Sequence, residues 1–312
     1  MRYFVGVTDY NWYDFLSARP DIDEVNFWQP SGGREFKALQ PGELFLFKLH
    51  SPRNFIVGGG VFAHWSSLPV SLAWEAFGEK NGAASLEQMR TRLARYRHEA
   101  EDPRVDYPVG CILLEQPFFL RGSEWIPAPE DWKPNIVQGK GYDSSEGEGR
   151  RVWQQLTATM AATHVAEVSE WPYEPADVGE RYGRPMIVAP RLGQGSFRVV
   201  VTDAYDRRCA VTGERTLPVL QAAHIKPYGL NGPHSPQNGL LLRSDLHTLL
   251  DCGYVTVTPD LRVKVSRRIR EEYENGRDYY ALDGQPVRLP SRADLAPSRE
   301  YLEWHASNVF RG

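Results

Sequence analysis

The sequence predicts an α+β protein of two domains, and three observations support this prediction. The chain has 312 residues, and chains of this length commonly divide into domains of about 100–200 residues. Short β-type runs separated by Pro-Gly and polar turns dominate the first part. Residues 209–253 have instead the pattern of a strand, a loop, a second strand and a helix. We therefore expect a β-rich first domain over 1–168, a linker over 169–195 and a second domain over 196–312.

The composition is that of a globular protein, with 41% hydrophobic, 24% charged and 12% aromatic residues. No apolar run reaches the length of about 18 residues that a membrane span needs, and the first residues lack the pattern of a signal peptide. Cys111, Cys209 and Cys252 form neither a disulfide framework nor a C-x-x-C clip, so we expect a reducing, cytoplasmic environment. The net charge of −4 is uneven, at +3 from residue 191 onward and −7 before it. The second domain is thus the more basic one.

In the first domain, alternating apolar residues predict strands at residues 3–7, 25–29, 43–49, 55–62 and 109–120. Helical spacing predicts helices around residues 12–16 and at 72–77, 86–96 and 152–168. Residues 125–149, rich in Pro and Gly, predict a loop. The glycines at 58–60 would let the backbone pass close to a neighbouring strand or a ligand. Such short strands favour a small curled sheet or a β-barrel.

In the second domain, a helix is predicted at 196–205, followed by a β-type run that ends on His224. A loop rich in Gly, Pro and Asn leads to Asn238 and a strand of three leucines. Ser244 stands at the expected N-cap of a helix that ends near Gly253. A hairpin over 254–265 and a short helix over 299–310 complete the domain.

Three residues of this segment indicate a hydrolytic metal site. His247 and Asp251 are four residues apart on the predicted helix, so both side chains lie on one face. An imidazole nitrogen and a carboxylate oxygen so placed make half of a divalent-cation site. His224, at the end of the strand, would be a base directed at the same point. This combination predicts metal-assisted hydrolysis of a phosphodiester.

The segment resembles the ββα-metal core of the HNH nucleases. The resemblance rests on a C-x-x-T-G turn, an A-A-H-I-x-P-Y strand and an N-G-L-x-L-x-x-D-x-H-x-x-x-D block. It implies that His224 activates water, that Asn238 braces the loop, and that His247 and Asp251 bind the metal. Ala223 stands where many family members have a further Asp or His ligand. Two protein ligands suit a hard cation, Mg²⁺ or Mn²⁺, and leave open whether Asp245 takes part.

Four basic side chains near this core are candidate contacts for the nucleic-acid backbone, with a solvated basic face as the alternative. They are Arg207, Arg208, Lys226 and Arg243.

The first domain resembles the EVE-type domains of the PUA-like superfamily. The matching residues, in order, are Trp28, the 37–39 and 41–43 segments, Leu46-Phe47, His50-Ser51 and the 56–58 segment. The resemblance implies a PUA-like β-barrel with helices that binds nucleic acid, with a modified base held in an aromatic pocket. The expected pocket residues, for which packing in the core is the competing interpretation, are Trp28, Asn26, Ser31, Trp12, Trp65 and Tyr10.

Together the two resemblances imply a modification-dependent restriction endonuclease that reads a modified cytosine and cuts DNA nearby. Double-strand cleavage would require a homodimer or transient pairing, since one such site cuts one strand. Two alternatives stay open at this point: a non-specific or RNA-directed nuclease, and a binding protein with a degenerate HNH module. The sequence does not distinguish which modification is read or where the cut falls.

Overall fold

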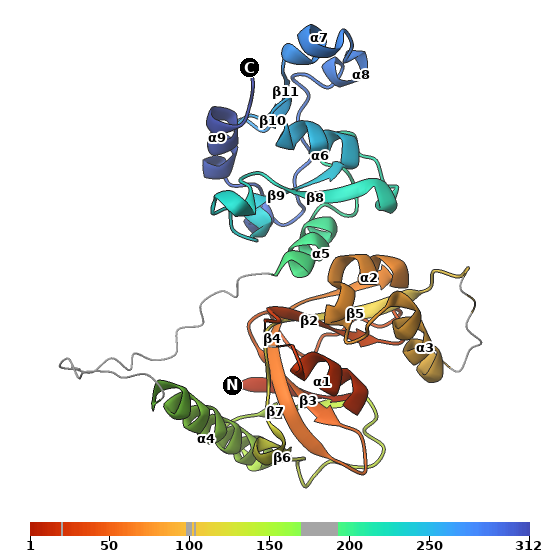
Figure 1. Cartoon of the computed structure of the whole chain (residues 1–312), viewed down its shortest axis with the longest axis vertical. Helices are drawn as coiled ribbons and strands as arrows, with labels where there is room; N and C mark the ends of the chain where they lie inside the picture. Colours follow the sequence, from red (N-terminus) through yellow and green to blue (C-terminus); the bar gives the residue numbers. More distant parts are fainter. Residues whose placement is uncertain (20, 98–101, 103, 170–192) are drawn as a thin grey trace, which may run out of the picture. The chain divides into compact units, whose positions relative to one another are not determined.

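The chain, in this computed structural model, divides into two compact units, Met1–Pro190 and Arg191–Gly312. The structure describes residues 1–19, 21–97, 102, 104–169 and 193–312 (Figure 1). The linker predicted over 169–195 lies almost entirely outside these residues. Within the described segments, no helix combines the length and the apolar character that crossing a bilayer requires.

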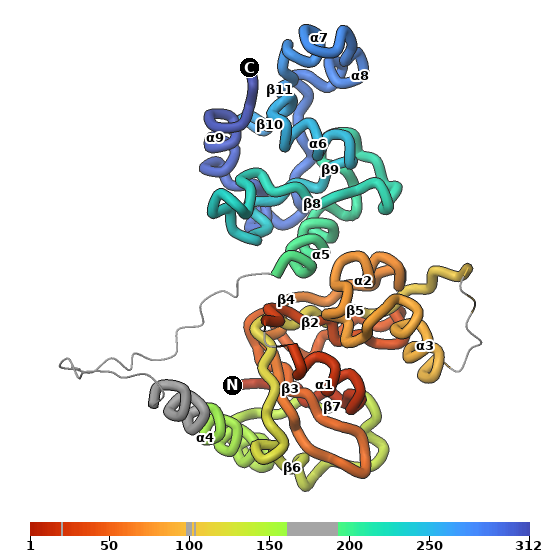
Figure 2. Tube along the Cα trace, in the orientation of Figure 1, coloured from red at the N-terminus to blue at the C-terminus, as the bar shows by residue number. Residues whose placement is uncertain are grey.

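Seven strands in the described part of the first unit form one mixed sheet (Figure 2). The strands are β1 (Arg2–Thr8), β2 (Glu24–Gln29), β3 (Leu44–Leu49), β4 (Phe55–Pro69), β5 (Pro108–Phe119), β6 (Ile126–Pro127) and β7 (Gly139–Asp143). Their order is β2-β5-β4-β3-β1-β7, with β6 paired to β4. The β1–β3 pair is parallel, with Val5 opposite Leu46, and the other pairs are antiparallel. The α+β class is therefore confirmed.

The predicted closed barrel is not found in the described residues. The strand order is an open path whose edges are β2 and β7, and no ladder joins these two strands. β7 pairs with β1 on one side, and its other side has no strand partner in the described residues. The first unit thus contains a curled sheet that stays open.

Two regions differ from the predicted strands and loops. β4 continues to Pro69, beyond the expected end at residue 62, because it pairs with β5 along this extension, after a register shift between Phe62 and His64. The predicted loop over 125–149 contains β6 and β7. β7 has no buried residues and is held by its backbone pairing to β1, so it carries no apolar pattern.

Glycines allow β4 to pass closely between its neighbours. A Cβ at Gly58 would lie 2.2 Å from the Phe118 carbonyl oxygen of β5, and one at Gly59 would lie 2.7 Å from the Phe45 carbonyl oxygen of β3. Any larger residue would push these strands apart. The close approach predicted for this segment is thus to strands on both sides.

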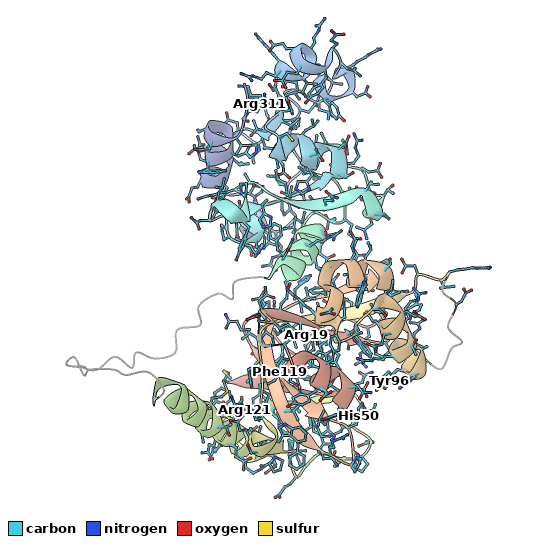
Figure 3. All side chains as sticks on the ribbon, viewed as in Figure 1. Arg19, His50, Tyr96, Phe119, Arg121 and Arg311 are labelled. Carbon is cyan, nitrogen blue, oxygen red and sulfur yellow. The ribbon has the colours of Figure 1, made fainter. Side chains whose placement is uncertain are left out.

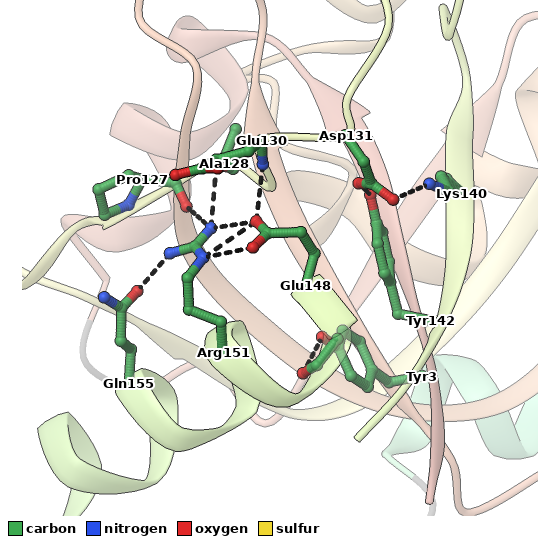
Figure 4. Close-up of polar contacts among 11 residues, drawn as sticks. Tyr3, Pro127, Ala128, Glu130, Asp131, Lys140, Tyr142, Glu148, Arg151 and Gln155 are labelled. Atoms are coloured by element: carbon green, nitrogen blue, oxygen red, sulfur yellow. Dashed lines mark hydrogen bonds and ion pairs between the residues drawn. The ribbon is translucent and has the colours of Figure 1, made fainter. Parts of the chain in front are cut away.

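Helices α1 (Tyr10–Ser17), α2 (Val70–Phe77), α3 (Leu86–Arg97) and α4 (Gly147–Ser169) complete the first unit. The α1 residues Trp12 and Leu16 pack in an aromatic core with Phe45 and Phe47 of β3. α4 is attached to the sheet through polar contacts at its first turn (Figure 4). There Tyr3 of β1 donates a 2.8 Å hydrogen bond to the Gly149 carbonyl, and Arg151 donates to the carbonyls of Pro127 in β6 at 3.4 Å and Ala128 at 3.1 Å.

The second unit is built on an antiparallel hairpin. β8 (Leu220–His224) pairs with β9 (Gly239–Arg243), which places His224 opposite Gly239. The described part of this unit also contains five α-helices and a second hairpin, along with loops and short 3-10 turns: α5 (Gln194–Ala204), α6 (Ser244–Asp251), β10 (Val255–Val257), β11 (Val263–Val265), α7 (Arg268–Tyr273), α8 (Arg277–Tyr280) and α9 (Arg299–Asn308). α5 and α6 lie on opposite sides of the β8–β9 hairpin (Figure 1). The hairpin and both helices share one core, in which Val201, Leu241 and Leu246 are buried.

The α6 helix begins one residue earlier than predicted. Its N-cap is Arg243, and no side chain caps it, so Ser244 is the first helical residue instead of the cap. At its end Gly253 takes a positive φ of 76°, a conformation that favours glycine, and its N–H donates to the Leu250 carbonyl. The helix therefore has the length needed to place His247 and Asp251 on successive turns.

Candidate active site

Asn238 holds the loop between β8 and β9 in shape. Its side chain is completely buried, and its Oδ1 accepts a 2.8 Å hydrogen bond from the Lys226 N–H. Its Nδ2 donates to the carbonyls of Lys226 at 2.9 Å and Pro233 at 3.0 Å. One buried amide thus forms three hydrogen bonds to the backbone and ties together the two ends of the loop that follows His224.

His224 lies between α5 and this loop. Its ring stacks on Phe197 of α5, with centroids 3.9 Å apart and planes 13° apart. Its Nε2 lies 2.9 Å from Nδ1 of His234, a residue of the loop that the sequence did not single out. Burial lowers the pKa of His224 to about 4, and the nearby imidazoles of His234 and His247 contribute to the shift. His224 is therefore neutral at physiological pH, the form that can accept a proton.

His247 and Asp251 lie together on α6. The distance from His247 Nε2 to the Asp251 Oδ2 is 3.4 Å. On its other nitrogen, Nδ1, His247 contacts Gln221 Oε1 of β8 at 2.8 Å. Because an amide oxygen only accepts hydrogen bonds, this contact assigns the proton to Nδ1 and leaves the Nε2 lone pair toward Asp251. Gln221 is a second residue that the sequence did not indicate.

Ala223 and Asp245 are the two positions considered for a further metal ligand. Gln221 and Ala223 lie on one side of the strand and His224 on the other. Ala223 is completely buried in the core, so a ligand at this position would have to displace apolar packing. Asp245 is held away from a ligand role by two 2.7 Å hydrogen bonds from Arg243.

The Cys209 turn connects the hairpin to α6. The buried Cys209 thiol accepts 3.4 Å contacts from the N–H groups of Thr212 and Arg243. One contact closes the C-x-x-T-G turn, and the other reaches the residue that precedes α6. The thiol therefore stabilises the start of the helix that carries His247.

The four candidate phosphate contacts differ in their surroundings. Arg243 is paired with Asp245, and Arg207 forms a 3.3 Å ion pair with Asp203. Both arginines would have to exchange a carboxylate for a phosphate. Lys226 lies with its ammonium 5.4 Å from the Trp304 ring centroid, and Arg208 has a buried Nε without a hydrogen-bond partner in the described residues.

Comparison with known proteins agrees with this geometry. Residues 209–258 match the HNH endonuclease family. The predicted resemblance of this segment is thereby confirmed, and the second unit carries an HNH nuclease module. No curated protein matches the sequence of the chain.

Solved structures similar to the chain include two kinds of protein. One is the ASCH protein from Zymomonas mobilis, at 10% identity over 50% of this chain and 94% of that one, with a TM-score of 0.33. Another is the modification dependent TagI restriction endonuclease, at 15% identity over 97% of this chain and 81% of that one, with a TM-score of 0.28.

The donor atoms of the HNH module fit a hard divalent cation that is completed by water and substrate oxygens. An imidazole nitrogen and a carboxylate oxygen face each other across one helical turn. In the part of the chain that the structure describes, no three His, Cys, Asp or Glu side chains are grouped as a metal site. His247 and Asp251 are the residues that would hold such a cation.

The six residues expected to form a base pocket in the first unit lie in different surroundings. Tyr10, Trp28 and Trp65 pack against the hydrophobic cluster that contains Trp12, and Trp28, like Asn26, donates a hydrogen bond to Asn81. Trp12 and Asn26 are buried, at 2% and 0% exposure, and Asn26 bonds to the side chain of Asn81. Trp65 donates to Gln29, which neighbours Trp28 on β2, so the two tryptophans lie on opposite sides of the sheet. Trp12 and Asn26 are thus packed in the interior of the first unit, the competing interpretation given for them, and a pocket role for these residues stays a prediction.

Ser31 and Tyr10 lie in other surroundings. Ser31 accepts a hydrogen bond from the Gly33 N–H within an exposed turn. The Tyr10 ring lies 4.0 Å from the Arg53 guanidinium, which covers one of its faces.

Trp28 belongs instead to a surface cluster that we call the Tyr96 cluster, formed by Asp9, Trp28, His50 and Tyr96. The Tyr96 ring is 6.2 Å from Trp28 and stacks on His50 at 6.4 Å. Tyr96 and His50 are labelled in Figure 3. Tyr96 donates a 2.6 Å hydrogen bond to Asp9 Oδ1, and His50 Nε2 lies 3.7 Å from the same oxygen. Burial and this bond raise the pKa of the Tyr96 phenol. The cluster presents aromatic faces beside a carboxylate acceptor at an accessible surface.

Proposed function

We propose that the chain is a metal-dependent DNA endonuclease directed by a modified cytosine. The observation that carries the nuclease part is a neutral His224, held by Phe197 and His234, within an HNH module that also pairs His247 with Asp251. These are the parts that phosphodiester hydrolysis needs: a proton acceptor and a place for a cation.

In the proposed reaction, His224 accepts a proton from a water molecule as the water oxygen attacks phosphorus. The bond from phosphorus to the 3′ oxygen breaks, and that oxygen takes up a proton from solvent. The products are a 5′-phosphate and a 3′-hydroxyl. Stacking on Phe197 keeps the His224 ring in one plane, and the Asn238 bonds hold the loop beside it. Both contacts favour a fixed orientation of the base.

His247 and Asp251 would hold the divalent cation, Mg²⁺ or Mn²⁺. When bound, the cation would neutralise charge on the phosphate and on the departing oxygen. Gln221 supports this role of His247, because it keeps the proton on Nδ1 and directs Nε2 toward Asp251.

The Tyr96 cluster is our candidate for the base-reading site of the first unit. A base turned out of the helix offers two π-faces and an edge with hydrogen-bond donors. Trp28, His50 and Tyr96 supply aromatic faces, and Asp9 supplies an acceptor for the amino group of a cytosine derivative. The proposed backbone contacts in the HNH module are Arg207, Arg208, Lys226 and Arg243, of which Arg207 and Arg243 would exchange a carboxylate for a phosphate.

Each HNH module would cut one strand. A double-strand break therefore requires two copies, as a homodimer or in transient pairing on DNA.

The test uses otherwise identical DNA duplexes that carry cytosine, 5-methylcytosine, 5-hydroxymethylcytosine or its glucosylated form, with Mg²⁺ or Mn²⁺ and with EDTA. We expect cleavage of one or more modified duplexes only, and none with EDTA. Equal cleavage of all four would contradict the modified-cytosine proposal and leave a non-specific nuclease. Cleavage of RNA alone would identify an RNA-directed nuclease, and binding without cleavage would identify a degenerate module.

A further inference from the structure

His234 takes part in a chain of four stacked or tilted rings in the HNH module. Phe197 stacks on His224, and His224 meets His234 with centroids 5.0 Å apart at 58°. Tyr228 stacks on the far side of His234, at 4.3 Å and 11°. Tyr228 is itself 65% exposed. His234 thus lies between His224, the proposed general base, and the exposed Tyr228 of the loop.

The backbone of the loop sets the position of His234. Pro233, the residue before it, accepts a hydrogen bond from the buried Asn238 amide. One residue earlier, a Cβ at Gly232 would lie 1.8 Å from the Lys226 carbonyl oxygen, so only glycine allows the chain to fold back at this point. His234 is therefore directed toward His224 by a braced turn.

The contact with His234 occupies Nε2 of His224. The direction of this hydrogen bond therefore decides whether Nδ1 of His224 carries a proton or a lone pair. Nε2 of His224 and Nδ1 of His234 are 2.9 Å apart, so one of them carries the proton that they share. If His224 donates from Nε2, its Nδ1 keeps a lone pair and can accept a proton. If His234 donates instead, the Nε2 lone pair of His224 is engaged and its Nδ1 is protonated, and the ring cannot act as a base.

We propose that His234 is a positioning residue, which accepts a hydrogen bond from Nε2 of His224 and so leaves Nδ1 of His224 as the proton acceptor. This role rests on the proposed nuclease function. The same hydrogen bond persists after proton transfer. The imidazolium of His224 still donates from Nε2 to His234, so this hydrogen bond does not have to rearrange during the reaction.

The first test reads the tautomer without any cleavage. Long-range ¹H–¹⁵N correlation spectra of the full-length, metal-free chain labelled at histidine would report which nitrogen of His224 is protonated, with His224→Ala to assign the signals. We expect the Nε2–H form in the unmodified protein and a mixture of forms in His234→Ala. His234→Asn should restore the Nε2–H form, because the asparagine Oδ1 takes the place of Nδ1 as acceptor.

Leu230→Ala, in the same loop and at a position that is 55% exposed, is the matched control and should leave the spectrum unchanged. An Nδ1–H form in the unmodified protein, or no change in His234→Ala, would overturn the proposal. Thermal melting would establish that each variant is folded.

The second test is kinetic and uses the DNA that the protein cuts best. His234→Ala should lower kcat by about 10- to 100-fold, a typical effect of losing a residue that orients a catalytic group, with KM changed by no more than about 2-fold. His234→Asn should recover most of kcat, and Leu230→Ala should retain it. An unchanged kcat in His234→Ala would refute the positioning role. If no variant and no unmodified protein cuts, the nuclease proposal fails while the tautomer spectra still decide the hydrogen bond.

Discussion

The HNH module and the Tyr96 cluster are assembled in different ways. In the module, His224, Asn238, His247 and Asp251 come from one short span, and a hairpin followed by a helix brings them together. The Tyr96 cluster joins residue 9, strand β2, the end of β3 and helix α3. A site made within one local motif can be recognised from residue spacing, whereas a site made from distant elements requires the fold.

The two units also differ in how burial acts on an ionisable group. Burial lowers the pKa of His224 to about 4, which keeps a proton acceptor neutral at the site. In the first unit, burial raises the pKa of Glu115 to about 7, with Glu24 and Asp23 adding to the shift. Neither carboxylate oxygen of Glu115 has a hydrogen-bond partner in the described residues. The same physical effect supports chemistry in one unit and weakens the fold in the other.

The largest effect should come from the module. We expect His224→Ala to reduce the cleavage rate by about 100- to 10,000-fold, the range for loss of a general base. DNA affinity should change little, since the substitution removes a proton acceptor and none of the proposed phosphate contacts, and the melting temperature should fall modestly because the contacts with Phe197 and His234 are lost. The measurement is single-turnover cleavage together with DNA binding. Cleavage by His224→Ala at the normal rate would show that His224 is not the general base.

A smaller effect on cleavage is expected from removing the hydrogen bond between Gln221 and His247. Gln221→Leu removes the acceptor for Nδ1 of His247 and should weaken the apparent Mg²⁺ affinity by about 10-fold or more. Titration of cleavage against Mg²⁺ concentration would show a rightward shift, with a nearly normal rate at saturating metal. An equal loss at all metal concentrations would indicate that Gln221 acts on something other than the cation.

A substitution of one ring in the Tyr96 cluster should change the preference for modified DNA without changing the HNH module. Tyr96→Ala should reduce the preference for modified over unmodified DNA by about 10-fold, since one base–aromatic stack contributes about 1–3 kcal/mol. Tyr96→Phe keeps the ring, loses only the bond to Asp9 and should retain most of the preference. Competition binding measures this ratio. Full discrimination by Tyr96→Ala would place base reading elsewhere in the first unit.

The smallest effect on activity, and a distinct effect on stability, is expected from Glu115→Gln. Because the folded state holds this proton more tightly than the unfolded state, the free energy of unfolding falls as pH rises from about 4.5 to about 7. The free energy of unfolding of the variant should not fall over this pH range. The variant should therefore be more stable than the unmodified protein at pH 8, by on the order of 3 kcal/mol, and differ little from it at pH 4. Thermal melting at both pH values tests this, with the exposed Glu87→Gln as control. Parallel melting curves for both proteins across this range would contradict the prediction.

Much of the fold followed from local patterns. Alternation located β1 to β5, and helical spacing located α3. β6 and β7 were not predicted, because short strands held by backbone pairing carry no apolar signal. The closed barrel was wrong because closure depends on which strand edges meet, and no single segment contains that information.

The sequence by itself determined the HNH module, since hairpin and helix geometry convert fixed spacing into fixed distances between side chains. It also determined the α+β class. Only the tertiary structure decided that Gln221 and His234 contact the two histidines, that Arg243 is engaged by Asp245, and that Trp28 meets Tyr96. The physical reason is that hydrogen bonds and ring contacts between distant elements depend on how the chain packs, and packing brings together residues whose spacing in the sequence shows no pattern.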